Sequence, residues 1–199
     1  MIDKATIESE LIAEEYLFAL FARVFGTTPD AGLLLELISD DAREALSGFL
    51  SEEQLVDFDV LQSSLSMALG EDDELKNLAD EYFRGLEAPG SMIAYPWESV
   101  YTEGAPLIFQ KSTLSVIESF RQEGFRLELE ANVPQDHIAY ELLFMALLAS
   151  QNNQEGYLRF KDEHLLRWVP RYCDDLQALP NSNYLTTTAR LLKAFVEKA

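Results

Sequence analysis

The sequence is poor in the residues that mark several familiar kinds of site. Its single cysteine, Cys173, excludes an internal disulfide and is consistent with a reducing compartment. Because it has no cysteine pair and only two histidines, we expect no metal site and no cofactor. Its nine glycines match neither GxGxxG nor GxxxxGK followed by Ser or Thr, which excludes the common phosphate-binding loops.

Long apolar runs and a basic leader are also lacking. No apolar run approaches ~18 residues, the length that spans a bilayer, so we expect no membrane span. Residues 1–8 hold no basic stretch ahead of an apolar core, and we therefore expect no signal peptide. These absences predict a soluble protein of the cytoplasm.

Basic residues are scarce: 15 Lys and Arg stand against 35 Asp and Glu, for a net charge of −20. The imbalance is greatest in residues 1–90, which hold 21 acidic and 5 basic side chains. An acidic field repels nucleic acid and anionic lipid, so we expect neither as a partner. The acidity either attracts a basic partner or serves only solubility.

What the sequence does have is helical periodicity. Apolar residues recur at three- and four-residue spacing, no stretch alternates like a strand, and there is no internal repeat. Ser51 and Gln54 have the spacing of a capping box. The pattern predicts an all-α fold, a single globular domain over residues 1–199 with about ten helices. The main predicted helices cover 6–25, 28–38, 41–49, 51–69, 71–86, 112–123, 134–150, 157–168 and 184–196.

The stretch 134–150 predicts a buried central helix. Pro134 suits a first helical turn, and Asp136 would place an anion at the positive end of the helix dipole. The rest is too apolar for a surface helix. Its polar start, Asp136 and His137 with Glu141 one turn on, is the favoured place for a site, although Asp136 could equally be only a cap.

A long loop is predicted over residues 87–106, which hold three of the seven prolines and show no helical period. Long ordered loops in compact domains are often functional. Tyr95, Trp97 and Tyr101 lie within seven residues there. Trp97 could either plug the core beneath the loop or line a binding surface, and the sequence leaves both interpretations open.

Catalytic patterns are not found. His137 and Glu141 lie four residues apart on one helix face, which suits two metal ligands but more often marks a simple side-chain pair. No GxSxG nucleophile turn is present. We therefore expect no catalytic residues, no metal ligands and no enzymatic activity.

Three motifs together resemble the TorD/DmsD family of cytoplasmic redox-enzyme maturation chaperones. They are Glu81–Pro89, Tyr95–Tyr101 and Val133–Met145, the last followed by Phe160, His164, Trp168 and Pro170. Members of this family are all-helical. They bind the twin-arginine signal peptide of a molybdenum-cofactor oxidoreductase and hold that enzyme back from export until its cofactor is loaded.

The resemblance implies that the loop at Trp97–Ser99 and the pair Asp136 and His137 form the peptide-binding region. The family often has Gly where this chain has Glu98. Guanidinium groups need carboxylates, and the apolar part of a signal peptide needs a groove that aromatic rings could wall. The predicted peptide-binding residues are Tyr95, Trp97, Glu98, Ser99, Tyr101, Asp136, His137 and Glu141.

Two other functions remain open at this stage. One is a helical adaptor that docks a folded partner without a peptide groove. The other is a small hydrolase using Asp136, His137 and Glu141. We also expect either a monomer or a domain-swapped homodimer, because the loop over 87–106 and the polar break near Asn152 could act as hinges.

Overall fold

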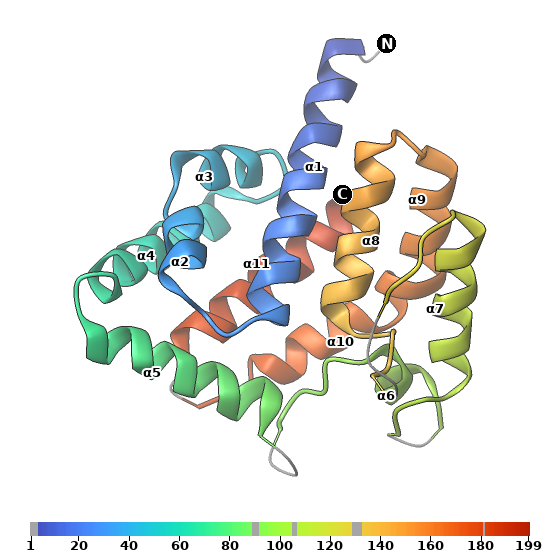
Figure 1. The fold of residues 1–199 in the computed structure, drawn as a ribbon. Coiled ribbons are helices and arrows are strands. Elements are labelled where there is room, and N and C mark those ends of the chain that lie inside the picture. Colours follow the sequence, from blue (N-terminus) through green and yellow to red (C-terminus); the bar gives the residue numbers. More distant parts are fainter. Residues whose placement is uncertain (1–3, 89–91, 105–106, 129–132, 181) are drawn as a thin grey trace.

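Helices make up the architecture of the chain, as the sequence predicts. The computed structural model describes residues 4–88, 92–104, 107–128, 133–180 and 182–199, with side chains from residue 10 onward (Figure 1). Within these ranges no strand occurs, and the β-type pairing is one isolated antiparallel bridge between Trp97 and His137. The all-α prediction is therefore confirmed. The elements are α1 (Lys4–Gly26), α2 (Ala31–Leu37), α3 (Asp40–Ser47), α4 (Glu52–Ala68), α5 (Asp72–Tyr82), η1 (Phe83–Glu87), α6 (Glu98–Thr102), α7 (Lys111–Gln122), α8 (Ile138–Ser150), α9 (Gln154–Phe160), η2 (Lys161–Leu165), α10 (Leu166–Leu176) and α11 (Asn183–Lys198), where η marks a π-helical turn.

Side-chain caps explain several helix starts. The Gln54 backbone N–H donates to Ser51 Oγ over 3.3 Å, and the Ser51 N–H donates to Gln54 Oε1 over 2.9 Å. The predicted capping box is thus confirmed. Ser39 caps α3 by accepting from the Ala42 N–H over 3.1 Å. Each cap satisfies a backbone donor that the first turn leaves without an intrahelical partner.

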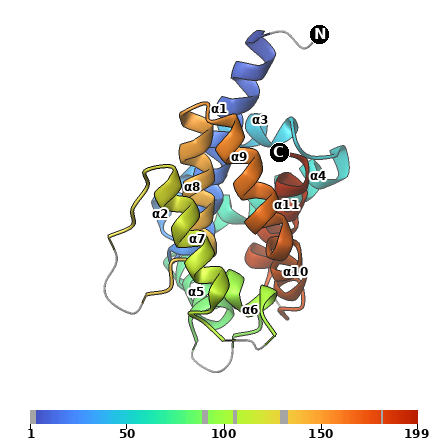
Figure 2. The same ribbon diagram turned by 90° about the vertical axis from the view of Figure 1, so that its right-hand side faces the viewer.

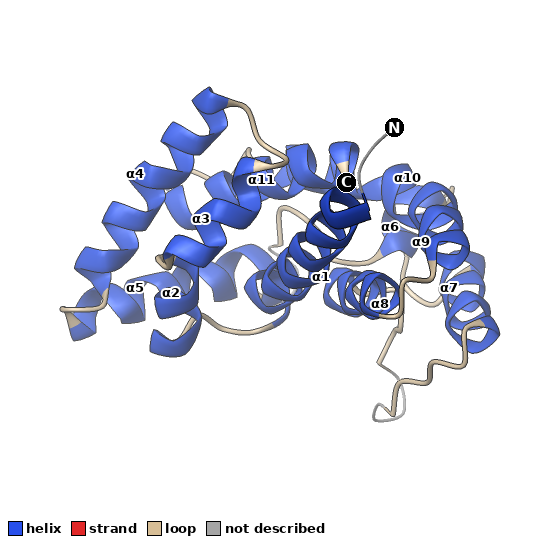
Figure 3. Ribbon diagram, turned by 90° about the horizontal axis from the view of Figure 1, so that it is seen from above, coloured by secondary structure: helices blue, strands red, loops and turns tan. Residues whose placement is uncertain are grey.

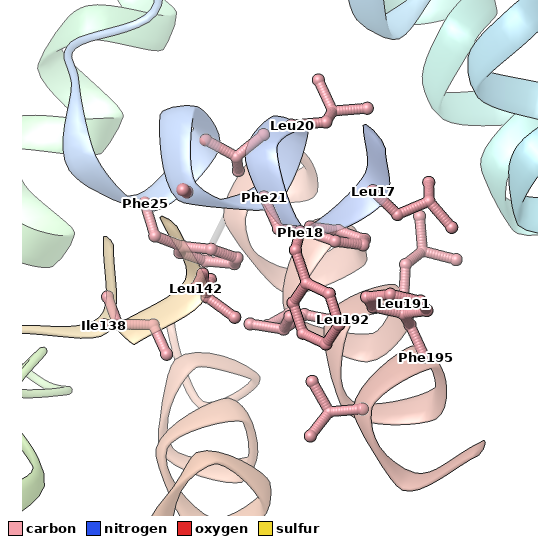
Figure 4. Close-up of a cluster of buried hydrophobic side chains, with 14 of the residues drawn as sticks. Leu17, Phe18, Leu20, Phe21, Phe25, Ile138, Leu142, Leu191, Leu192 and Phe195 are labelled. Atoms are coloured by element: carbon pink, nitrogen blue, oxygen red, sulfur yellow. The ribbon is translucent and has the colours of Figure 1, made fainter. Parts of the chain in front are cut away.

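Helix α8 lies in the interior, and α1 packs along it in the most extensive helix pairing of the described chain (Figure 1). Gly26 permits this close approach, because a Cβ at that position would lie 2.6 Å from Ala139 Cβ. Aromatic and aliphatic side chains of α1, α8 and α11 fill the space between these helices, among them Phe18, Leu142 and Phe195 (Figure 4). The predicted buried central helix is confirmed.

The remaining helices flank this centre on two sides. Seen from above, α2 to α5 lie on one side of α1, and α6, α7 and α9 lie on the other (Figure 3). The first turns of α1 project beyond the other helices, which is plain in both side views (Figures 1 and 2). None of the described helices is both long and apolar enough to cross a bilayer.

Three predicted boundaries were wrong. The helix predicted over 157–168 does not end before Pro170, because α9, η2 and α10 follow one another without a break through that proline to Leu176. The central helix begins at Ile138 and not at Pro134, because residues before it pair with the segment around Trp97 instead of extending the helix. The loop predicted over 87–106 contains the short helix α6. Residues 89–91 and 105–106 of that loop lie outside the described residues.

Candidate functional site

Two motifs far apart in the sequence meet where α6 and α8 begin. The Ile138 N–H donates to the Pro96 carbonyl over 2.9 Å, and the Glu98 N–H donates to the Asp136 carbonyl over 3.0 Å. This pair of bonds holds residues 96–98 antiparallel to residues 136–138, with Trp97 opposite His137. Side chains alternate across such a pairing, so neighbouring residues point to opposite sides.

The outer side carries Trp97 and His137, whose ring centroids lie 5.5 Å apart with the rings nearly perpendicular. The Tyr140 ring lies 5.6 Å from the His137 ring. His137 also caps α8, because its Nδ1 accepts from the Ala139 N–H over 3.2 Å. Burial lowers the pKa of His137 from its ordinary 6.5 to about 4, so the ring is neutral at pH 7.

These rings form one wall of a cavity of about 340 Å³, which we call the Trp97 pocket. The Trp97 Nε1 has no hydrogen-bond partner among the described residues, so this wall holds an unused donor. Among the described residues of the lining, Glu87 is the one that is acidic. The lining residues are Gly26, Tyr82, Leu86, Glu87, Met92, Trp97, Val133, His137, Ala139 and Tyr140.

The inner side of the same junction holds a chain of polar groups. Glu98 is only 3% exposed, and its Oε2 lies 2.8 Å from Nδ1 of His164, which is 2% exposed. The other ring nitrogen of His164, Nε2, lies 3.1 Å from Ser119 Oγ. The π-helical turn η2 carries His164, and such turns interrupt the regular helical spacing, often at functional sites.

Asp136 and Glu141 are also enclosed on this side, each 0% exposed. Asp136 Oδ2 accepts from the Ser99 N–H over 2.8 Å, which ties the start of α6 to the chain ahead of α8. Trp168 Nε1 donates to Glu141 Oε2 over 3.0 Å. Together with Glu98, His164 and Ser119, these residues form what we call the inner polar cluster. Its members are Glu98, Ser99, Ser119, Asp136, Glu141, His164 and Trp168.

The surroundings of the Glu141 carboxyl favour its neutral form. Burial raises its pKa well above the ordinary value, and the nearby Glu98 and Asp136 carboxyls raise it further. Its Oε1 accepts from no donor among the described residues. A protonated Glu141 can instead donate to Glu98, which satisfies both carboxyls without placing two negative charges side by side.

The structure thus divides the predicted site residues between two sides. Trp97 and His137 line the pocket, whereas Glu98, Ser99, Asp136 and Glu141 are enclosed in the inner polar cluster. Direct contact between these three carboxyls and a bound peptide would need exposed oxygens, which this arrangement does not offer. Neither Tyr95 nor Tyr101 lines the pocket.

Tyr101 lies against α10 instead. Its ring centroid is 5.6 Å from that of Trp168, and its hydroxyl donates to Asp175 Oδ2 over 3.0 Å. The Arg171 guanidinium lies 5.7 Å from the Tyr101 ring centroid, and its Nη2 donates to the Tyr101 carbonyl. Tyr101 therefore fastens α6 to α10.

The order Ser119, His164, Glu98 repeats the hydrogen-bond order of a hydrolase triad. Ser119 lies inside α7, however, where backbone N–H groups bond to carbonyls within the helix. Such amides are not free to stabilise an oxyanion, which acyl transfer requires. The geometry therefore supports a structural hydrogen-bond chain. No group of three or more metal-ligating side chains occurs among the residues whose positions are described.

Sequence reasoning missed Glu87 and Tyr140 in the pocket, and Ser119 in the inner polar cluster. His164 and Trp168 were noted only as part of the family resemblance. Their partners lie 66 and 27 residues away in the chain, so no local pattern connects them. A signal for Glu87 was its place at the end of a predicted helix, directly before the aromatic loop.

The all-helical fold has a counterpart among solved structures. It is similar to the crystal structure of an Archaeoglobus fulgidus protein assigned to redox enzyme maturation, with a TM-score of 0.60 and 21% identity, over 93% of this chain and 94% of that one. At this identity the likeness shows the fold alone.

The sequence comparisons identify the family. The family model described as "Nitrate reductase delta subunit" matches residues 40–174. The Haemophilus influenzae protein named "Probable Tat proofreading chaperone DmsD" is 28% identical over 140 residues, 70% of this chain and 68% of its own length. The Photobacterium profundum "Chaperone protein TorD" is 31% identical over 138 residues, 64% and 63% of the two chains. The chain belongs to the nitrate reductase delta subunit family, among its TorD and DmsD chaperones, as its motifs predict.

Proposed function

We propose that this protein is a cytoplasmic maturation chaperone that binds the twin-arginine signal peptide of a molybdenum-cofactor oxidoreductase before export. The observation that carries the proposal is the Trp97 pocket, which the two most specific motifs of the chain build together. The names of its relatives, Tat proofreading chaperone and chaperone protein TorD, support the same function.

The chemistry of the pocket suits such a peptide. Its apolar lining, including Leu86, Met92 and Val133, can cover the apolar middle of a signal peptide. The aromatic rings of Trp97 and Tyr140 can accept an arginine by cation–π contact, at about 0.5–2 kcal/mol each.

Glu87 supplies the negative charge. It is the one carboxylate among the described lining residues, it is exposed, and it ends the continuous helix formed by α5 and η1. The C-terminal end of a helix is negative, so the dipole and the carboxylate both favour a cation at this point. We therefore propose Glu87, rather than the enclosed carboxyls, as the first partner for a guanidinium group.

In this proposal the inner polar cluster does not contact the peptide but holds the pocket wall in place. Asp136 holds the Ser99 amide and Glu98 holds His164, so both fix the backbone on either side of Trp97 and His137. A binding wall fixed in this way loses little conformational freedom when a peptide binds.

Isothermal titration tests the proposal. The ligand is the signal peptide of a twin-arginine oxidoreductase encoded beside this protein, together with a version in which lysines replace both arginines. We expect micromolar or tighter binding that the lysine version weakens, because lysine lacks the planar fork that pairs with a carboxylate. The absence of measurable heat with either peptide would overturn the proposal.

The site is tested with two variants. Trp97→Ala should weaken binding about tenfold or more, because aromatic anchors dominate such interfaces. Phe109→Ala is the matched control, since Phe109 is 51% exposed and does not line the pocket. Equal loss in both variants would place the peptide elsewhere. If the precursor enzyme binds equally well with and without its signal peptide, the protein is an adaptor instead.

A further inference from the structure

A second hollow lies far along the molecule from the first. It is a groove of about 620 Å³ between α1, α3 and the end of α11, which we call the α1–α3 groove. It lies beside the part of α1 that rises above the other helices (Figure 1). Its lining residues are Glu10, Ile12, Ala13, Glu14, Tyr16, Asp41, Glu44, Ala45, Ser47, Gly48, Phe49 and Lys198.

The groove has an apolar base and an exposed apolar wall. Phe49 lies at the base, where its ring packs against Phe195 with centroids 5.0 Å apart. Ile12 stands on the α1 wall with 68% of its surface exposed, and Ala13 and Ala45 widen the apolar area. A partner that covers Ile12 and the ring of Phe49 would remove this apolar surface from water.

Carboxylates surround this apolar base. Glu10 and Glu14 stand on α1, and Asp41 and Glu44 stand on α3. None of the four forms an ion pair with a described residue. Burial raises the pKa of Glu14, while Tyr157 and the charge of Lys161 act in the opposite direction. Among the described lining residues one is basic, Lys198, whose Nζ donates to the Gly48 carbonyl over 2.9 Å.

Charge decides what can occupy the groove. A second copy of this chain carries a net charge of −20 and would meet the same acidic surface, which disfavours self-association here. Nucleic acid and anionic lipid are repelled for the same reason. A segment with basic side chains along one edge and apolar ones along the other matches both the carboxylates and the base of the groove.

We propose that the α1–α3 groove is a second docking site, which takes a basic amphipathic helix of a partner protein. Ile12 and Phe49 receive the apolar face of that helix, and Glu10, Glu14, Asp41 and Glu44 pair with its Arg and Lys side chains. The groove shares no lining residue with the Trp97 pocket, so both sites can be filled at once. This site goes beyond the proposed signal-peptide binding.

Fluorescence anisotropy tests the proposal with a labelled 16-residue probe that carries Arg on one helical face and Leu on the other. The double variant Glu10→Gln with Glu44→Gln removes two groove charges. The control Glu52→Gln with Glu53→Gln removes two exposed charges from α4, outside the groove. We expect at least tenfold weaker binding in the first variant and less than twofold in the control.

Equal loss in the two double variants would overturn the proposal, because the probe would then sense only net charge. Ile12→Ser should weaken binding of the probe at least fivefold. An unchanged affinity would show that Ile12 does not contact the probe. Ile12 and the four substituted glutamates are exposed, and far-UV circular dichroism checks that each variant keeps its helices.

Trp97→Ala should leave the affinity for the probe unchanged. If Trp97→Ala abolishes it, the probe occupies the Trp97 pocket and the second site fails, whereas signal-peptide binding there would remain intact as a proposal. If the signal peptide does not bind but the groove variants still weaken the probe, the second site stands without the first.

Discussion

The two tryptophans of the chain stand on opposite sides of one junction and have opposite surroundings. Trp168 is 0% exposed, and its Nε1 donates to Glu141 inside the inner polar cluster. Trp97 is half-buried, lines a pocket, and has an Nε1 without a partner among the described residues. The Trp168 ring belongs to the interior, whereas the Trp97 ring lines the pocket and can contact a ligand there.

Neighbouring residues of the same motifs also differ in whether they face the pocket or the interior. Trp97 and His137 face the pocket, while Glu98 and Asp136 turn inward. A motif of this kind therefore combines two tasks, with one residue placed to contact a partner and the next fixing the backbone beneath it. Substitutions on the two sides should separate binding from stability.

The largest effect is expected on the inner side. His164→Ala would leave the enclosed Glu98 carboxyl without its partner, and breaking such a buried pair costs about 3–5 kcal/mol of unfolding free energy. Urea denaturation at pH 7 measures it. His137→Ala on the outer side is the comparison and should cost only about 1 kcal/mol, the value of a helix cap. An equal loss of unfolding free energy in His164→Ala and His137→Ala would contradict the different roles given to the two sides.

Acid should destabilise the protein through His137. Burial lowers its pKa from 6.5 in the unfolded chain to about 4 in the folded one, so the unfolded state binds the proton first. The stability from the neutral ring is complete above pH 6.5 and is lost as the pH falls toward 4. The loss should reach about 1–3 kcal/mol.

The matched variant for this pH effect is His137→Asn, which can still cap α8 but does not titrate. Denaturation midpoints of both proteins between pH 7 and pH 4.5 give the comparison. The parent should lose more stability than the variant over that range. Parallel curves would show that His137 does not carry the pH dependence.

Trp97→Ala should act mainly on binding. We expect a loss of about 1.5–2 kcal/mol in peptide binding free energy, with a smaller change in unfolding free energy, because the ring is only half-buried. Titration and urea denaturation of the same preparation give both numbers. A stability loss of about 3–5 kcal/mol would instead assign Trp97 to the core.

The smallest effect is expected for Glu87→Gln. This carboxylate is exposed, and an exposed ion pair contributes about 0.2–1 kcal/mol, so peptide binding should weaken roughly two- to fivefold. The loss should shrink in high salt, which screens exposed charges. A further version of the peptide, in which glutamine replaces every Arg and Lys, should bind the parent and Glu87→Gln equally. A larger loss with that version would show that Glu87 acts on the shape of the pocket.

The sequence predicts the helices well because their apolar spacing is local, as in the capping box of Ser51 and Gln54. It misplaces the start of α8 because Asp136 and Ile138 make hydrogen bonds with a segment 37 to 42 residues earlier. The five residues of α6 are too few to show a helical period.

Only part of the candidate site can be predicted from the sequence. Trp97 and His137 are found through their motifs. The enclosure of Glu98 and Glu141 depends on His164 and Trp168, which reach them through η2 and α10. From the sequence alone, the carboxylates of a motif are expected to be charged and exposed, because their distant partners cannot be identified. The predicted monomer or domain-swapped dimer stays a prediction.

The contrast between the pocket-lining Trp97 and the enclosed Trp168 is tested most directly by nuclear magnetic resonance. The two indole N–H signals are followed during titration with the twin-arginine signal peptide. Two tryptophans give two indole signals, which Trp97→Phe assigns. We predict that the Trp97 signal moves strongly as the peptide binds, while the Trp168 signal, held by Glu141, stays in place. Movement of the Trp168 signal with a fixed Trp97 signal would contradict the account.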